Sequence, residues 1–162
     1  MYIYYDQGRN DILNSIFSKN LEGEGMRVVS NRGIAIVPEC SEGTIILKMV
    51  DENEKEIESI EMDFESASLL TTLLDYGAIY AENITRDFKK DGVMLKKIKD
   101  VGTCFAGNGN RVSIAILPAD ERRSASILIG FHKGNNHSSI ILKPKKAAYL
   151  SKIITKLIIS NL

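Results

Sequence analysis

The chain has 162 residues, of which 44% are hydrophobic and 26% are charged, and its formal net charge is zero. This composition is typical of a soluble globular domain that is large enough to bury a core. No apolar run approaches the roughly 18 residues that a membrane-spanning helix needs. The first residues also lack the basic and apolar segments of a secretory signal. We therefore expect neither a membrane partner nor export.

Charge is divided unevenly along the chain. Residues 1–90 contain nine basic and seventeen acidic residues, a net charge of −8, whereas residues 91–162 contain twelve basic and four acidic residues, a net charge of +8. Such asymmetry suggests that the basic half is adapted to a polyanion. Alternatively, the two halves attract each other within one chain or between copies.

Cysteine is rare in this sequence. Cys40 and Cys104 are the only two, which is too few for a disulfide framework. We expect both to be small buried residues and the protein to work in a reducing compartment such as the cytoplasm.

The N-terminal extension, residues 1–25, precedes the regular part of the sequence. The stretch "YIYY" is typical of a strand, and Ile12, Leu13, Ile16 and Phe17 recur at helical spacing. We expect this extension to pack over a sheet edge or an oligomer interface.

Residues 26–90 contain four strand-like stretches followed by a helical pattern. The stretches 26–31, 34–37, 44–50 and 57–62 are rich in β-branched residues and bounded by Gly, Pro, Asn and acidic clusters. Ala67, Leu70, Leu73 and Leu74 then recur at helical spacing, and Asp63 or Ser66 is the expected helix cap.

Residues 91–162 follow the same order. Strands are predicted at 103–108, 114–117, 126–132 and 139–142, with a hairpin-type turn in "GNGN" at 107–110. A second helix is predicted by the spacing of Ala147, Leu150, Ile154, Leu157 and Ile158, and Pro144 suits its first turn.

The two segments are also similar in sequence. "NRGIAIVPE" at 31–39 is similar to "NRVSIAILPA" at 110–119 with an offset of 80, and 44–50 matches 126–132 with an offset of 82. We ascribe the change of offset to a turn that is two residues longer in the second copy. Residues 59–74 then match 139–154 with an offset of 80 again. Because the order, spacing and residue class agree, we infer an internal duplication.

The predicted fold is therefore α+β, with two pseudo-symmetric β-β-β-β-α repeats, antiparallel sheets and helices packed on one face. The expected organisation is an extension (1–25), an acidic first repeat (26–90) and a basic second repeat (91–162), which together form one compact domain. Alternate residues of 45–49 and of 127–131, Phe131 included, should form the faces that the helices cover. His132 and Lys143 should then point outward, and Asp63 is the counterpart of Lys143 in the first repeat.

The second repeat carries the side chains that a single-strand binder needs, namely cations that track phosphates and flat groups on which bases stack. The candidate nucleic-acid-binding residues are Lys96, Lys97, Lys99, Phe105, Arg111, Arg122, Arg123, His132, Lys133, Lys143, Lys145 and Lys146. His137 and Tyr149 are further stacking candidates, although Tyr149 fits helix packing better. Lys145 and Lys146 oppose the helix dipole, a local cost that suggests another purpose. A solvated lysine surface is the alternative interpretation.

Two fused β-β-β-β-α units resemble the Whirly and Pur-alpha families, and they are similar to the positive-cofactor transcription coactivators, which form this arrangement from two chains. The resemblance covers roughly residues 26–160 and concerns topology and duplication, so no family residue is transferred. It implies an open sheet face that binds single-stranded DNA or RNA, often in a higher oligomer.

An enzymatic function has little support in the sequence, which has no Walker phosphate loop, nucleophile elbow or His-Glu-x-x-His motif. His132 and His137 lack a neighbouring cysteine or acidic ligand, so we expect no metal and no cofactor. We expect a non-enzymatic protein that binds single-stranded nucleic acid in transcription, replication or recombination, as a homodimer or higher oligomer. A protein partner could occupy the acidic half. The alternative is an assembly module in which acidic and basic halves of neighbouring copies pair.

Overall fold

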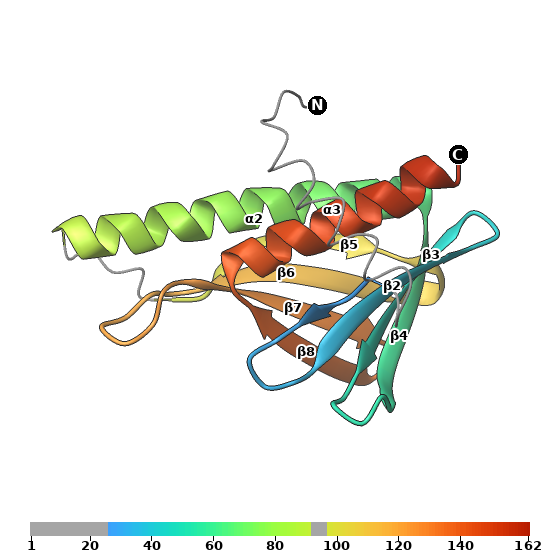
Figure 1. Cartoon of the computed structure of the whole chain (residues 1–162), viewed down its shortest axis with the longest axis horizontal. Coiled ribbons are helices and arrows are strands. Elements are labelled where there is room, and N and C mark those ends of the chain that lie inside the picture. The colour runs from blue at the N-terminus through green and yellow to red at the C-terminus, as the bar shows by residue number, and fades with distance from the viewer. Residues whose placement is uncertain (1–25, 92–96) are drawn as a thin grey trace, which may run out of the picture.

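The computed structural model describes residues 26–91 and 97–162 (Figure 1). The predictions for residues 1–25 and for Lys96 lie outside this part of the chain. The first unit contains β1 (Val28–Val29), β2 (Ala35–Ser41), β3 (Thr44–Val50), β4 (Glu56–Asp63) and α2 (Phe64–Asp91). The second contains β5 (Lys99–Phe105), a short 3₁₀ turn η1 (Gly107–Gly109), β6 (Arg111–Leu117), β7 (Ser126–Lys133), β8 (Asn136–Leu142) and α3 (Pro144–Ser160). The predicted α+β fold with two β-β-β-β-α units is confirmed.

Each unit forms a four-stranded sheet in which consecutive strands pair antiparallel, in the orders β1-β2-β3-β4 and β5-β6-β7-β8. Strand alternation assigns one face of each sheet to the core, as predicted: alternate side chains of 45–49 and 127–131, Phe131 included, are almost completely buried. We call these apolar faces the inner faces and the opposite ones the outer faces.

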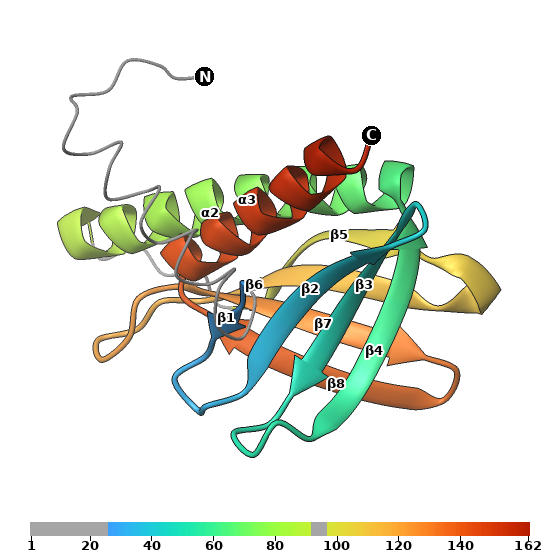
Figure 2. The same ribbon diagram turned by 45° about the vertical axis from the view of Figure 1, so that its right-hand side comes forward.

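The two helices are exchanged between the sheets (Figures 1 and 2). Helix α2 follows the first sheet but lies mainly on β5, β6 and β7, whereas α3 follows the second sheet and contacts the first sheet more than its own. Gly77 of α2 lies so close to the second sheet that an added Cβ would be 3.5 Å from Ile127 and 3.6 Å from Ile114. The sequence pattern predicted helix-covered faces but not which helix covers which sheet.

Polar contacts anchor this exchange at several points. The Cys104 thiol of β5 donates to the Ser66 carbonyl oxygen of α2 at 3.0 Å, and the Ala125 N–H donates to Thr85 Oγ1 of α2 at 2.9 Å. Between the helices, Ser151 Oγ donates to the Thr71 carbonyl oxygen at 3.3 Å. Both inner faces and both helices therefore belong to one continuous core.

The helix starts agree with the predictions. The Asp63 carboxylate accepts the Ser66 N–H at 2.8 Å and caps α2, and this hydrogen bond lowers the pKa of Asp63. Pro144 occupies the first turn of α3, and Lys143 precedes it as Asp63 precedes α2.

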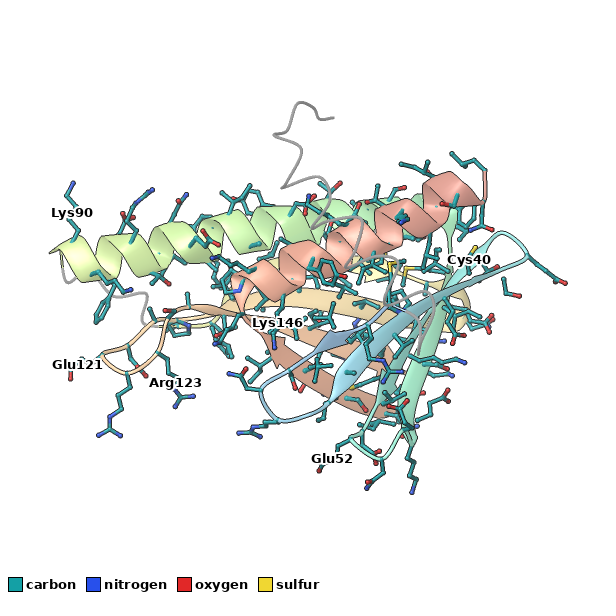
Figure 3. The ribbon with its side chains drawn as sticks, viewed as in Figure 1. Cys40, Glu52, Lys90, Glu121, Arg123 and Lys146 are labelled. Carbon is teal, nitrogen blue, oxygen red and sulfur yellow. The ribbon has the colours of Figure 1, made fainter. Side chains whose placement is uncertain are left out.

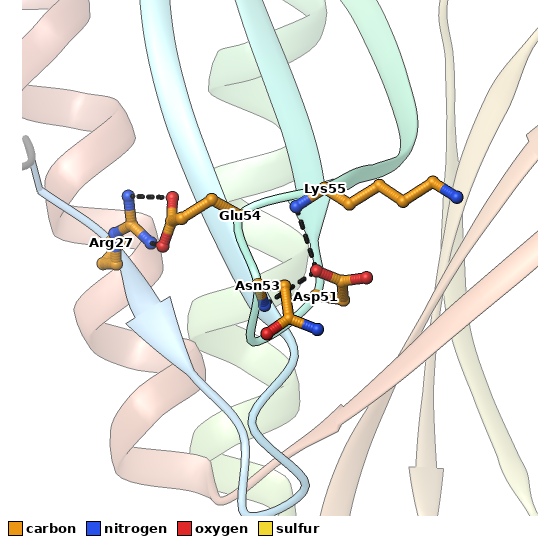
Figure 4. Close-up of polar contacts among 5 residues, drawn as sticks. All are labelled: Arg27, Asp51, Asn53, Glu54 and Lys55. Carbon is orange, nitrogen blue, oxygen red and sulfur yellow. Dashed lines mark hydrogen bonds and ion pairs between the residues drawn. The ribbon is translucent and has the colours of Figure 1, made fainter.

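The acidic loop between β3 and β4 is a tight turn (Figure 4). One oxygen of the Asp51 carboxylate accepts the N–H groups of Asn53 and Lys55, both at 2.9 Å. Glu54 binds the Arg27 guanidinium through both carboxylate oxygens, at 2.7 and 3.1 Å. The carboxylates of this loop therefore support the local structure.

One part of the predicted alignment is wrong. Cys40 of β2 pairs with Ile45, and Ile116 of β6 pairs with Ile127, so β2 and β6 correspond with an offset of 76 rather than 80. The physical reason is turn length. Residues 42 and 43, both with positive φ, join β2 to β3, whereas residues 118–125 join β6 to β7. A shift of four keeps the strand alternation, so the inner faces were still predicted correctly.

The fragments 1–91 and 92–162 should test the helix exchange. Each alone leaves an inner apolar face without the helix that covers it, so neither should show a cooperative thermal transition. Mixing the fragments should restore the transition, measured by circular dichroism. A fragment that melts cooperatively alone as a monomer would contradict the exchange.

Candidate nucleic-acid interface

The outer face of the second sheet carries a row of four side chains, one from each strand. Phe105 of β5 pairs with Arg111 of β6, Arg111 pairs with His132 of β7, and His132 pairs with His137 of β8. Odd-numbered residues of β6 and even-numbered residues of β7 alternate away from the buried positions, so these side chains share one face. We call Phe105, Arg111, His132 and His137 the outer row.

The outer row is open to solvent. Phe105 is 69% exposed, Arg111 and His137 are exposed, and His132 is half-buried. The helices contact the opposite face of this sheet. An aromatic ring, a guanidinium and two imidazoles thus form an accessible line across four strands.

Next to the outer row lies a band of small side chains. Thr103, Ser113, Gly130 and Ser139 occupy successive paired positions on the same face. The following positions of this face are aliphatic on three strands, with Ala115, Leu128 and Ile141, whereas β5 contributes the exposed Asp100, which pairs with Ala115. Small residues allow a ligand to approach the sheet closely, and the row beside them provides the charge.

The two histidines are in direct contact. Their ring centroids are 4.4 Å apart, and the rings are inclined by 46°. Ser113 Oγ lies 2.9 Å from His132 Nε2. A Cβ added to Gly130 would lie 2.7 Å from Ser113 Oγ, 3.0 Å from His132 Nε2 and 3.3 Å from His137 Nε2. The absence of a side chain at Gly130 therefore provides the space into which these three polar atoms converge.

Burial lowers the pKa of His132 below its ordinary value of 6.5, and the positive charge of Arg111 and the neighbouring His137 lower it further. A lowered pKa keeps this imidazole neutral at pH 7. At that pH the permanent charge of the outer row therefore comes from Arg111.

Four candidates at the far end of the strands do not join the outer row. Lys99 points to the helix side of the sheet, where its Nζ lies 5.1 Å from the ring centroid of Tyr80 on α2. Arg122 and Arg123 are exposed on the loop after β6, which projects from the body of the molecule (Figure 3). Since β6 rises about 3.4 Å per residue, its two ends are about 20 Å apart. Lys97 is exposed just before β5, which begins at the same distant end.

Two other candidates hold the molecule together. Lys133 Nζ donates to the Ser59 carbonyl oxygen at 3.1 Å and lies 3.6 Å from the Glu58 carboxylate, so it joins the second unit to the first. Lys146 Nζ of α3 donates to the Val29 carbonyl oxygen of β1, at the helix start labelled in Figure 3. Lys146 thus opposes the helix dipole, as predicted, but it also makes a hydrogen bond within the fold.

Lys143 and Lys145 are exposed at the start of α3, which follows the end of β8 opposite to His137. Tyr149 packs against the core, as the sequence favoured. Of the eleven candidates within the described residues, the structure brings only Phe105, Arg111 and His132 together, and it adds His137. The spacing of the two histidines contained a usable signal, because a two-residue turn at 134–135 pairs positions five apart.

The outer face of the first sheet has the opposite charge. Glu39, Glu61 and Asp63 are exposed there, and Lys48 lies 2.9 Å from Glu39. Asp63 corresponds to Lys143, so equivalent faces of the two units differ in charge.

Comparisons with known proteins give no family. A scan against protein-family models finds no match, and a search of curated proteins finds none either. Within residues 26–91 and 97–162 no helix has the length and hydropathy needed to cross a membrane. The same described residues contain no group of three or more His, Cys, Asp or Glu arranged to hold a metal ion.

A pH titration should reveal the state of His132. Because its pKa in the folded chain is lowered, the unfolded chain binds the proton more readily, and stability is lost as the pH falls below 6.5 towards the lowered pKa of His132. We expect a histidine NMR titration to give a midpoint below 6.5 for His132, and the Arg111→Ala variant to raise this midpoint. A midpoint above 6.5, or one that Arg111→Ala leaves unchanged, would contradict the assigned causes.

Proposed function

We propose that this protein binds single-stranded DNA or RNA through the outer face of the second sheet. The observation that supports the proposal is the outer row, which combines an exposed aromatic ring, a guanidinium and two imidazoles on a face that the helices leave open. Flat side chains can stack on any base, and cations pair with phosphate, so this combination suits binding without base-specific contacts.

The neighbouring band of small residues fits the same function. Thr103, Ser113 and Ser139 present short hydroxyl side chains, which can donate to phosphate or sugar oxygens without obstructing the strand. Ile141, 45% exposed, extends the face with an apolar surface beyond them. The proposed path of the strand therefore crosses β5 to β8 along the outer row.

The proposal is a binding function without catalysis, in transcription, replication or recombination, and it extends to a homo-oligomer as in the Whirly and Pur-alpha families that the topology resembles. We further propose a reducing, cytoplasm-like setting, because Cys40 and Cys104 are both free thiols.

The second candidate function is assembly between copies. The exposed acids Glu39, Glu61 and Asp63 on one unit and the cationic outer row on the other would make a head-to-tail contact, which is salt-sensitive and can propagate. The ion pair of Lys133 with Glu58 already joins the two halves within one chain. This function predicts self-association in sedimentation and indifference to nucleic acid.

Matched arginine variants provide the main test of nucleic-acid binding. Arg111→Ala should weaken binding of a labelled oligothymidine or oligouridine strand and reduce the magnitude of the log–log salt slope by about 0.7. Arg122→Ala removes the same charge from the distant loop and should change neither quantity. Fluorescence anisotropy at several salt concentrations measures both. Equal effects of the two variants would contradict the interface, and no binding of wild-type protein at low salt would end the proposal.

Phe105 tests stacking separately from charge. Phe105→Leu keeps an apolar side chain but removes the ring, and the loss of one stacked base should weaken binding about tenfold, that is about 1.4 kcal/mol. The salt slope should stay unchanged, because no charge is lost. Tyr76→Leu is the control, since Tyr76 is an exposed ring, 54% accessible, on the outside of α2. A lower salt slope, or the same loss of affinity in Tyr76→Leu, would count against stacking on Phe105.

A further inference from the structure

The chain contains two histidines in 162 residues, and the fold sets them directly opposite each other. They come from the hairpin of β7 and β8, whose two-residue turn at 134–135 pairs His132 with His137. Opposite residues of an antiparallel pair have Cβ atoms about 4.5–5.5 Å apart. Two imidazoles at such a distance can reach one ion between them.

The ring nitrogens face a common point. His132 Nε2 and His137 Nε2 would lie 3.0 and 3.3 Å from a Cβ at Gly130, and Ser113 Oγ would lie 2.7 Å from it. Both Nε2 atoms thus lie beside the space above Gly130. Any residue larger than glycine at this position would occupy that space.

The contact between Ser113 and His132 is compatible with the tautomer that a metal requires. If the Ser113 hydroxyl donates to His132 Nε2, 2.9 Å away, then the proton of the neutral ring is on Nδ1. A metal bound at Nε2 needs this same tautomer. The metal takes the lone pair that accepts the hydrogen bond, so the Ser113 hydroxyl has to turn away from Nε2 when the ion binds. Burial and the positive charge of Arg111 keep the ring unprotonated at neutral pH, and an unprotonated nitrogen is the ligand form.

We propose that His132 and His137 form a binding site for one divalent transition-metal ion of imidazole preference, with Zn²⁺, Ni²⁺ and Cu²⁺ as the class, beside the Ser113 hydroxyl. Imidazole nitrogen is a preferred ligand of these ions. Two protein nitrogens leave several coordination positions for water or an anionic oxygen, so the ion is exchangeable. The proposal reverses our expectation from the sequence, where we considered only neighbours along the chain.

Arg111 allows metal binding to be tested separately from the proposed nucleic-acid binding. Its guanidinium carries the same sign of charge as the ion and lowers the pKa of His132, so it opposes metal binding while it favours a phosphate strand. Removing it should therefore leave zinc affinity equal or higher and nucleic-acid affinity lower. The metal site does not depend on nucleic-acid binding, and it is tested without any oligonucleotide.

Calorimetric titration of the full chain with ZnCl₂ at pH 7.5 is the test, with histidine NMR signals as the second readout. Zinc should shift the imidazole signals of both residues at a stoichiometry of one. His132→Gln and His137→Gln should each weaken binding at least about tenfold, since even partners outside the coordination sphere change metal affinity about 10–100-fold. Binding should also weaken as the pH falls, because protons compete with the metal for imidazole nitrogen.

Two variants serve as controls. Arg111→Ala should bind zinc at least as tightly as the wild type, and Cys40→Ser should bind it equally, which excludes the half-buried thiol as the ligand. The thermal midpoint of each metal-free variant checks that the fold is retained. Zinc binding that survives both histidine variants, that does not weaken as the pH falls, or that requires Cys40 would overturn the proposal, as would the absence of binding to the wild type.

Discussion

The exchange of helices between the two sheets is the constraint on which the rest of the structure depends. Each sheet has an inner face of isoleucine, leucine, valine and methionine that has to be removed from water. Helix α2 approaches the second sheet closely because Gly77 and Gly102 lie at the contact; a Cβ at Gly102 would come within 2.7 Å of Leu73. Because neither unit covers its own sheet well, the duplicated halves fold as one body with a single core.

This arrangement leaves the outer faces free of helix packing, although Ala35, Val37 and Val50 form a small buried cluster on the outer face of the first sheet. A core position tolerates only apolar residues of similar volume, so the inner faces of the two repeats stayed alike. Equivalent outer positions instead differ in chemistry: Asp63 caps α2 whereas Lys143 precedes α3, and Val50 is buried whereas its counterpart His132 belongs to the outer row. The duplication therefore fixes where a binding face can lie, and its residues decide what it binds.

Prediction from the sequence succeeded where the regular spacing of apolar residues determines which side chains are buried. Alternation predicted that Ile45, Leu47 and Phe131 lie inside, and helical spacing placed both helices. Prediction failed where the structure depends on turn length or on contacts between distant segments. The similar phrases at 31–39 and 110–119 suggested an offset of 80, but the two-residue turn at 42–43 forces 76. No period in the chain encodes which helix covers which sheet.

The predictions for several lysines were wrong for a related reason, because the contacts of these side chains depend on distant segments. These contacts change how the charge asymmetry should be interpreted. A lysine in a basic half was counted as available to a polyanion, but Lys133 pairs with Glu58, Lys146 binds the Val29 carbonyl oxygen and Lys99 lies over Tyr80. Part of the positive charge of the second half is thus engaged in contacts between the two units and in a contact with a helix. The net charge of the second half is therefore weak support for a nucleic-acid face. The register that aligns Phe105, Arg111 and the two histidines across four strands is the stronger indication, because only side chains on a shared, exposed face can contact one ligand.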